Sequence, residues 1–419
     1  MKKQKKVIIF DYDGTLYNGD VLKGWGKYVK DFLSNYIGEK EAEDFIKRHG
    51  FESFNVCGQK IAGALVQDFG TAKALYEQQD KHNYVLKSSD LKYVDSNIIK
   101  NLKKYAKIYI VSNSPVSHVV NNSKNNNFDI SFADGIYANQ FNPKDVSKND
   151  IYVEILNKEK AKPENVFVVG DSVENDIVPA KKLGFNTLLV KTIKDIETVE
   201  LFVKKPIVKI CANKSIEDAK MCLSAYADLI GFLVGRVHSS SDFIDKETAK
   251  EIVNFVNGRV GCVLVTHLTS AKEIIELSKF IGNDYIQLHS EISECEVEKI
   301  VESLPNVKLI RLVHVGQDGK VETDFSKFRF VDFYLLDSFN KQTNQVGGTG
   351  LVHDLKTDKK LVQELYKPVF IAGGLNPENV ANAIKVSNPA GVDVNSGCTF
   401  NGIKNAKLVK TFVKNAKNC

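Results

Sequence analysis

The segment VIIFDYDGTL, residues 7–16, is the first apolar run of the chain, and it leads directly into two carboxylates. Its four leading residues are β-branched or aromatic, which predicts a short buried strand over Val7–Phe10. Asp11 and Asp13 come next, and Gly14 favours an irregular turn after them. Because ligands of open parallel sheets bind beyond the carboxyl ends of the strands, we expect both carboxylates to face a binding crevice.

Further apolar runs alternate with helical patterns up to about residue 190. The runs predict strands at 108–111, 166–169 and 187–190, and helices are expected around 97–105 and 178–183. Residues 18–90 differ, because apolar residues recur there at three-to-four spacing without strand-like alternation. Continuous apolar strands between helices predict a Rossmann-like parallel sheet. We therefore expect a capped domain over residues 1–200, whose helical cap occupies about 18–90.

A second series of strand and helix patterns begins at Pro206, after a charged segment, 191–206, that lacks this rhythm. Eight apolar runs predict strands at 207–210, 229–234, 262–265, 285–288, 308–313, 333–336, 369–371 and 391–394. A helical stretch follows nearly every one of them. This succession predicts a (β/α)₈ TIM barrel over residues 206–419.

Length and composition narrow the class of protein. A chain of 419 residues is too long for one ordinary core, so two domains are expected. The 57 basic and 52 acidic residues are spread along the chain, which argues against a nucleic-acid interface. No apolar run reaches about 18 residues, so no membrane span is expected. Seven cysteines without a Cys-x-x-Cys pair indicate a reducing, cytoplasmic location.

Polar residues also end the next two strands of the predicted sheet. Ser112 and Asn113 follow the second strand, and Asp171 and Asp176 follow the third within GDSVEND, residues 170–176. These side chains and the two N-terminal carboxylates are expected at one edge of the sheet. There, one carboxylate could attack phosphorus while the other protonates the leaving group. The simpler alternative is that the aspartates after the third strand only cap a helix.

These elements, in this order, resemble the haloacid dehalogenase superfamily over residues 7–190. The resemblance implies that Asp11 is the nucleophile and that Asp13 is the general acid/base and also offers a backbone carbonyl to Mg²⁺. It implies that Ser112 and its neighbour Asn113 bind phosphoryl oxygens. The implied metal site is Asp11, Asp13, Asp171 and Asp176, and oxygen ligands of this kind suit Mg²⁺.

A basic residue should neutralise the transferring phosphoryl group. We choose Lys148, which stands just before the helix expected near Ile151, and keep Lys144 in reserve. Lys162 precedes the third strand too closely and is expected on the far side. Because members that act on carbon–halogen bonds lack the second aspartate, Asp13 points to phosphate esters. The helical insert resembles the cap that closes over small phosphorylated metabolites.

In a (β/α)₈ barrel, catalytic groups lie at the carboxyl ends of the strands. Cys211 ends the first predicted strand and Asp337 the sixth, while Gly373-Gly374 and Asn395-Ser396-Gly397 form turns after the seventh and eighth. Glycine-rich turns there can bind phosphate through backbone N–H groups. A thiolate base and a carboxylic acid suit an aldose–ketose isomerisation of a phosphorylated sugar.

The same residues resemble phosphoribosylanthranilate isomerase over residues 207–415. The matching segments are VKIC (208–211), IQLH (286–289), LLD (335–337), GGTG (347–350), AGGLNPENV (372–380) and GVDVNSG (391–397). The resemblance implies that Cys211 is the base and Asp337 the acid. It also implies a phosphate grip formed by Gly348, Gly373, Gly374, Ser396 and Gly397.

Two positions depart from that family's pattern. Ala212 stands where the family has a glycine, and Asp242 stands where it has an arginine that meets the anthranilate carboxylate. An acid there would repel a carboxylate, although Arg236 or His238 could compensate. We therefore expect a bifunctional enzyme that joins a Mg²⁺-dependent phosphatase to an isomerase of a phosphorylated sugar or aminosugar. The alternatives are a true phosphoribosylanthranilate isomerase of tryptophan biosynthesis, and a non-catalytic sugar-phosphate-binding barrel.

Overall fold

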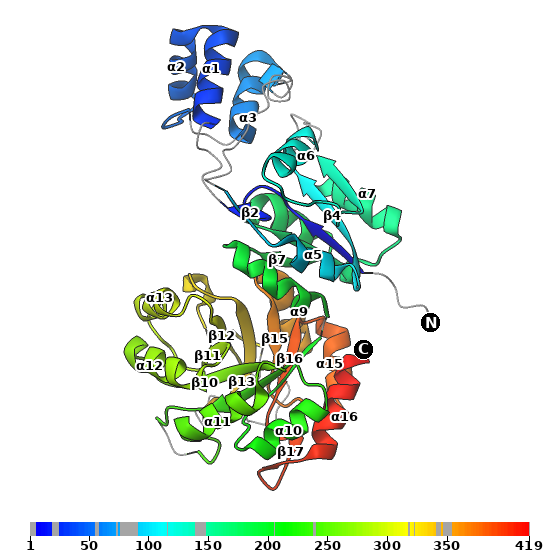
Figure 1. Cartoon of the computed structure of the whole chain (residues 1–419), viewed down its shortest axis with the longest axis vertical. Helices are drawn as coiled ribbons and strands as arrows, with labels where there is room; N and C mark the ends of the chain where they lie inside the picture. Colours follow the sequence, from blue (N-terminus) through cyan, green and yellow to red (C-terminus); the bar gives the residue numbers. More distant parts are fainter. Residues whose placement is uncertain are drawn as a thin grey trace. The chain divides into compact units, whose positions relative to one another are not determined.

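The chain forms two compact units in the computed structural model, Met1–Val203 and Lys204–Cys419 (Figure 1). The residues that the structure describes are 6–18, 25–54, 58–72, 74–75, 91–114, 116–138, 148–204, 206–237, 240–316, 319–321, 323–340, 345–346 and 354–418. No helix among these residues is both long and apolar enough to cross a bilayer.

The first unit is built on a five-stranded parallel sheet in the order β5-β4-β1-β6-β7. Its strands are β1 (Lys6–Phe10), β4 (Ala106–Ser112), β5 (Gly135–Ala138), β6 (Val166–Gly170) and β7 (Asn186–Leu189). The chain first builds outward on one side of β1, through β4 and β5, and then returns to add β6 and β7 on the other side. The order of the strands therefore reverses at β1, where such sheets form their binding crevice.

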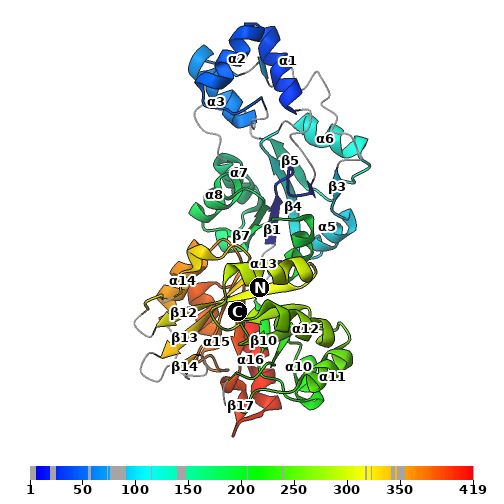
Figure 2. The same ribbon diagram turned by 90° about the vertical axis from the view of Figure 1, so that its left-hand side faces the viewer.

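Helices cover both faces of this sheet (Figure 2). One face carries α7 (Asn149–Glu159) and α8 (Val178–Lys182), and the other carries α5 (Ser96–Leu102). Tyr152 and Ile155 of α7 are buried against Val7 and Ile9 of β1. The helix α6 (Val116–Asn125) follows β4 directly at its carboxyl end. The predicted parallel α/β sheet is thereby confirmed.

The described residues of the insert that the sequence predicts to be helical form three helices. They are α1 (Trp25–Ile37), α2 (Glu39–Arg48) and α3 (Gly58–Phe69). Their apolar faces form a separate cluster that includes Phe32, Phe45 and Leu65. A two-stranded ribbon, β2 (Tyr17–Asn18) with β3 (Lys92–Tyr93), joins the chain before the insert to the chain after it.

Two features of this unit differ from the sequence prediction. The edge strand β5 was not predicted, because its four residues are all only partly buried and include a glycine. The charged segment 191–206 is also more regular than expected. It contains a 3₁₀ segment, Ile193–Thr198, and the helix α9 (Val199–Lys204). Phe202 of α9 is buried and its ring lies 5.2 Å from that of Phe167 on β6, so this segment packs on the first unit.

The second unit is a closed barrel of eight parallel strands, as predicted. The strands are β8 (Ile207–Ile210), β9 (Leu229–Leu233), β10 (Gly261–Thr266), β11 (Tyr285–Leu288), β12 (Lys308–Gly316), β13 (Phe333–Asn340), β15 (Val369–Ile371) and β16 (Gly391–Val394). Pairing of β16 with β8 closes the circle, because every other neighbour pairs in sequence order. A further strand, β14 (Gln345–Val346), pairs antiparallel with β13.

Helices surround the barrel (Figure 1). They are α10 (Ile216–Ser224), α11 (Lys246–Val256), α12 (Ala271–Ile281), α13 (Glu294–Ser303), α14 (Leu355–Glu364), α15 (Val380–Ser387) and α16 (Ala406–Lys417). Between β12 and β13, the described residues contain only a 3₁₀ turn, Phe325–Lys327. A small hairpin of β17 (Thr399–Phe400) and β18 (Ile403–Lys404) precedes α16.

Candidate active sites

The carboxyl end of β1 carries Asp11 into a buried cluster of charges. The backbone N–H of Asp11 donates to the carbonyl of Val169, which continues the pairing of β1 with β6 beyond the strand. Lys148, at the start of α7, places its Nζ 2.6 Å from Asp11 Oδ1 and 2.6 Å from Asp176 Oδ1. Lys148 and Asp176 are each only 1% exposed. The lysine chosen from the sequence therefore bridges two of the predicted carboxylates.

Asp171 completes a group of three carboxylates that could hold a metal ion. One oxygen each of Asp11, Asp171 and Asp176 lies within 4.8 Å of the other two. The Thr15 hydroxyl donates to Asp11 Oδ2 over 3.1 Å and lies 3.5 Å from Asp171 Oδ1. Three carboxylates around one lysine leave an excess of negative charge, and carboxylate oxygens are hard ligands. The cluster therefore fits a divalent cation such as Mg²⁺.

The electrostatics of the cluster follow from its burial. Burial raises the pKa of Asp11 well above its usual range; Lys148 opposes this shift, and the neighbouring aspartates add to it. Burial alone would lower the pKa of Lys148, but Asp11 and Asp176 outweigh it and hold that pKa above its usual range. Lys148 thus stays charged, and a cation bound beside Asp11 would favour the ionised carboxylate.

Asp13 lies in a different setting, surrounded by hydrogen-bond donors. Its Oδ2 accepts from the hydroxyls of Ser112, at 3.0 Å, and Ser114, at 2.9 Å. Its Oδ1 accepts from the Tyr17 hydroxyl, at 2.5 Å, and lies 3.0 Å from His118 Nε2. Burial alone would raise the pKa of Asp13, but the charge of His118 and these hydrogen bonds lower it below its usual range. These contacts therefore favour the ionised form of Asp13.

Of the other residues considered for this site, some lie beside the two carboxylates and one lies away from them. Ser112 is fully buried at the end of β4, and Asn113 is half-buried beside it. Lys162 lies at the amino end of β6, away from the cluster, and pairs with Glu164. Lys144 lies outside the described residues. Sequence reasoning missed His118, because a single histidine on a helix carries no recognisable signal.

The barrel places its predicted catalytic residues at the carboxyl rim. Cys211 follows β8 directly, is 8% exposed, and donates its backbone N–H to the carbonyl of Val394. Asp337 is also 8% exposed, but β13 continues past it to Asn340. Asp337 therefore lies within a strand, in register with His314 of β12, instead of directly after the strand as predicted.

The two glycine-rich turns pack against each other. A Cβ on Gly397 would lie only 2.0 Å from the carbonyl oxygen of Leu375, so this approach of the two backbones requires glycine. The Asn379 amide donates to the carbonyl of Gly374 over 2.9 Å and so ties the start of α15 to the first turn. Gly373 and Ser396 lie in the same two turns. Gly348 lies outside the described residues.

Two charged residues inside the barrel were not predicted as site residues. Lys209 of β8 and Asp393 of β16 form an ion pair, with 2.8 Å between Nζ and Oδ2. Both are buried, Lys209 being 1% exposed. A Cβ on Gly231 of the neighbouring strand would lie 3.1 Å from Lys209 Nζ and 3.1 Å from Cys211 Sγ, so the two groups lie near each other. A lysine and an aspartate within otherwise apolar barrel strands can be recognised in the sequence, and this pattern could have predicted them as site residues.

Asp242, the predicted departure at the anthranilate end, already has partners. The Asn395 amide donates to Asp242 Oδ2 over 2.9 Å, and Lys214 Nζ lies 3.8 Å from Asp242 Oδ1. Lys214 follows Cys211 by three residues, so it belongs to the same turn after β8. Of the two residues considered as compensation, Arg236 lies 3.5 Å from the carbonyl of Ser240, and His238 lies outside the described residues.

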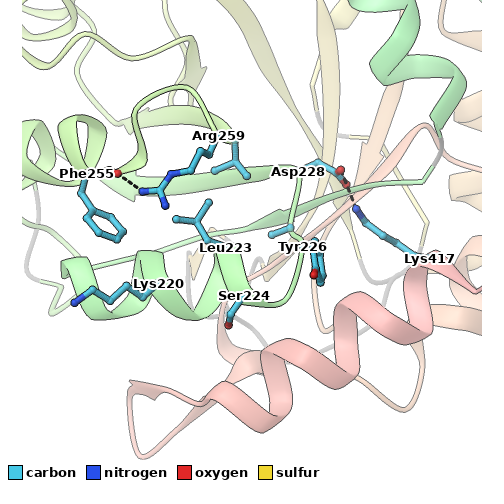
Figure 3. Close-up of a pocket in the computed structure, with 10 residues that line it drawn as sticks. Lys220, Leu223, Ser224, Tyr226, Asp228, Phe255, Arg259 and Lys417 are labelled. Atoms are coloured by element: carbon cyan, nitrogen blue, oxygen red, sulfur yellow. Dashed lines mark hydrogen bonds and ion pairs between the residues drawn. The ribbon is translucent and has the colours of Figure 1, made fainter.

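The opposite end of the barrel holds a separate pocket of about 610 Å³ (Figure 3). Asp228 and Val260, which directly precede β9 and β10, line it, so it lies at the amino ends of these strands. Lys417 pairs there with Asp228 over 2.8 Å. In barrels of this kind, catalysis occurs at the other end. The pocket is therefore distinct from the candidate active site.

Comparison with known proteins confirms both resemblances. Residues 5–184 match the haloacid dehalogenase-like hydrolase family, and residues 208–415 match the N-(5'-phosphoribosyl)anthranilate isomerase family. The Methanosarcina mazei protein named N-(5'-phosphoribosyl)anthranilate isomerase 2 is 42% identical over 212 residues, which make up 50% of this chain and 94% of that protein. The N-(5'-phosphoribosyl)anthranilate isomerase of Aquifex aeolicus is 35% identical over 217 residues, or 50% of this chain and 98% of that protein.

A solved structure of N-(5'-phosphoribosyl)anthranilate isomerase from Pyrococcus furiosus is 30% identical to this chain. The match has a TM-score of 0.43 and covers 51% of this chain and 100% of that one. The chain thus joins a haloacid dehalogenase-like hydrolase domain, residues 5–184, to a domain, residues 208–415, that belongs to the N-(5'-phosphoribosyl)anthranilate isomerase family.

Proposed function

We propose that this chain is a bifunctional cytoplasmic enzyme, a Mg²⁺-dependent phosphatase of a small phosphorylated metabolite joined to an N-(5'-phosphoribosyl)anthranilate isomerase. The observation that carries the phosphatase is the contact of Lys148 with both Asp11 and Asp176 in a buried carboxylate cluster. The observation that carries the isomerase is the 42% identity to a protein of that name, with Cys211 and Asp337 retained at the barrel rim.

In the phosphatase, Asp11 would attack phosphorus while the ester P–O bond breaks, which forms an aspartyl-phosphate. Asp11, Asp171, Asp176 and the backbone carbonyl of Asp13 would hold Mg²⁺. Bound Mg²⁺ would neutralise the charge on the phosphoryl oxygens. Lys148 would add a second positive charge on the same side.

Asp13 would donate a proton to the leaving alkoxide and then take one from the water that hydrolyses the aspartyl-phosphate. Its ionised resting state suits the second step. The negative charge of an arriving phosphoryl group favours protonation of Asp13 and so prepares the first step. Ser112 donates to Asp13 and would turn its hydroxyl to the phosphoryl oxygens when substrate binds.

In the isomerase, Asp337 would protonate the ring oxygen of the sugar as the C1–O bond breaks. Cys211 would then remove the proton from C2, and the electron pair of that C–H bond would form the double bond of the enolamine. The turns at Gly373-Gly374 and Ser396-Gly397 would bind the terminal phosphate through backbone N–H groups.

Asp242 favours a second candidate for the barrel, an isomerase of a phosphorylated aldose or aldosylamine that lacks the anthranilate carboxylate. An aspartate repels a carboxylate that the family's arginine would bind. Its contacts with Asn395 and Lys214 reduce that repulsion, and we therefore prefer the first candidate.

The two activities can be tested on the intact chain. Asp11→Asn should abolish Mg²⁺-dependent phosphate release, because an amide does not form the aspartyl-phosphate, while Asp44→Asn on the exposed surface of α2 should have no effect. Turnover of N-(5'-phosphoribosyl)anthranilate at about 10⁴ M⁻¹s⁻¹ or above, together with rescue of a tryptophan auxotroph lacking this isomerase, would support the first candidate. Failure of both, with turnover of another aldose phosphate, would support the second.

A further inference from the structure

We propose that Lys209 is a positioning residue for the barrel's reaction, whose ammonium group, fixed by Asp393, holds the Cys211 sulfur in place and stabilises its thiolate. This inference rests on the proposed isomerase function and deepens it by adding a buried ion pair to the catalytic thiol. The proton that Cys211 would take from C2 forms an S–H bond, so the sulfur must first carry the negative charge that Lys209 faces.

Strand geometry brings these groups together. Lys209 and Cys211 are two residues apart at the end of β8, so their side chains point to the same side, into the barrel. Asp393 is paired in register with Lys209 on the neighbouring strand β16. The 2.8 Å contact between Lys209 Nζ and Asp393 Oδ2 therefore fixes the ammonium inside the barrel.

The strand on the other side of β8 leaves room for this arrangement. A Cβ on Gly231 of β9 would lie 3.1 Å from Cys211 Sγ and 3.1 Å from Lys209 Nζ. The sulfur and the ammonium thus both lie against the backbone of Gly231, which carries no side chain. A side chain at this position would crowd both atoms, so glycine here leaves room for them.

Stabilisation of the fold does not by itself explain why this ion pair is buried inside the barrel. Barrel interiors are filled mainly by branched apolar side chains, and a buried ion pair often stabilises a fold less than apolar packing does. Asp393 Oδ1 is buried without a hydrogen-bond partner among the described residues, so the pair is not fully satisfied. A cation beside a thiol has a chemical use, since it favours the reactive thiolate.

The other charges around Cys211 have different effects. Burial raises the pKa of the Cys211 thiol, Lys209 opposes this shift most strongly, and Asp393 adds to it. Lys404 of β18 also favours the thiolate, but its ammonium donates to the carbonyl of Cys211 and not to its sulfur. The opposite signs of Lys209 and Asp393 allow an electrostatic role to be separated from a structural one.

The test is the pH dependence of alkylation of Cys211 by iodoacetamide in the intact chain, followed on the Cys211 peptide by mass spectrometry. Lys209→Met should raise the midpoint by about one pH unit or more, because the thiolate loses its cation. Asp393→Asn should lower the midpoint, and Lys209→Arg should leave it near that of the wild type. With N-(5'-phosphoribosyl)anthranilate, Lys209→Met should lower kcat about tenfold or more at neutral pH and change KM little.

An unchanged alkylation midpoint in folded Lys209→Met would overturn the proposal, as would a shift of Lys209→Met and Asp393→Asn in the same direction. If Lys209→Met does not fold, Lys209→Gln takes its place, and its midpoint must rise in the same way. A wild-type chain without isomerase turnover would contradict the proposed function of the barrel. The alkylation profiles would still test the role of Lys209.

Discussion

His118 Nε2 lies 3.0 Å from Asp13 Oδ1, so the helix α6 supplies a contact to the second carboxylate of the proposed phosphatase site. We predict that His118→Ala lowers kcat about tenfold to a hundredfold on an alkyl phosphate, because Asp13 loses one of its four partners. The loss should be smaller on para-nitrophenyl phosphate, whose leaving group needs little protonation. His49→Ala, which removes a histidine paired with Asp68 in the insert, is the control. Equal losses on both substrates would contradict a role in placing the proton donor.

Metal binding should stabilise the first unit in a pH-dependent way. The pKa of Asp11 is raised in the fold, so its contribution to stability is fully present below its ordinary pKa and is lost as pH rises through the folded value. Mg²⁺ binds the ionised carboxylates, so the Tm increase that it causes should grow as the pH rises.

Fluorescence can follow this unit alone, because the only tryptophan of the chain, Trp25, lies in it. Asp171→Asn should remove most of the Mg²⁺-induced increase in Tm. Asp44→Asn, outside the cluster, should retain it. A Tm increase that is the same at every pH would argue that the metal binds elsewhere.

Ala212 adopts a left-handed backbone conformation, with φ at 54°, directly after Cys211. A non-glycine residue pays a steric penalty there, so Ala212→Gly should raise the free energy of unfolding of the barrel by up to about 1 kcal/mol. Ala212→Val should lower it. The control is Ala225→Gly, since Ala225 caps α10 at a φ of −85° and glycine there should destabilise the unit. Urea unfolding followed by circular dichroism measures all three variants, and a loss of stability in Ala212→Gly would refute the strain argument.

Lys214 lies 3.8 Å from Asp242 Oδ1, where the resemblance places the anthranilate carboxylate. We predict that Lys214→Met raises KM for N-(5'-phosphoribosyl)anthranilate about tenfold with a smaller effect on kcat, because the carboxylate loses a charged partner. Lys220→Met, on the far end of the barrel, is the matched control. An unchanged KM would mean that the carboxylate binds elsewhere or that the true substrate has none.

The sequence was most informative where apolar runs were buried on both faces. Strands β8, β11, β15 and β16 begin and end where the apolar pattern predicts. Both faces of the barrel wall are covered, so the apolar run of each strand is not interrupted by exposed polar residues. The edge strand β5 was not predicted, since only one neighbouring strand pairs with it and its side chains stay partly exposed.

The site residues likewise divide into those whose closeness the sequence predicts and those whose closeness it does not. Asp11, Asp171 and Asp176 follow strands of one sheet, and their closeness could be predicted from topology alone. His118 and Tyr17 reach Asp13 through the exact path of a helix and a turn, which no local pattern encodes. Lys209 and Asp393 can be recognised in the sequence as charged residues within apolar strands. Their pairing depends on the closure of β16 on β8, which brings together residues 184 positions apart.

That closure also makes the ends of the barrel unit neighbours. Since β8 is the first strand of the barrel sheet and β16 the last, and α16 contacts α10, joining the two ends and opening another loop would interrupt no pairing of barrel strands. A circularly permuted barrel should therefore fold. By the same reasoning, a partner domain can be attached ahead of β8 without cutting the sheet, so fusion to a hydrolase places no topological demand on the isomerase.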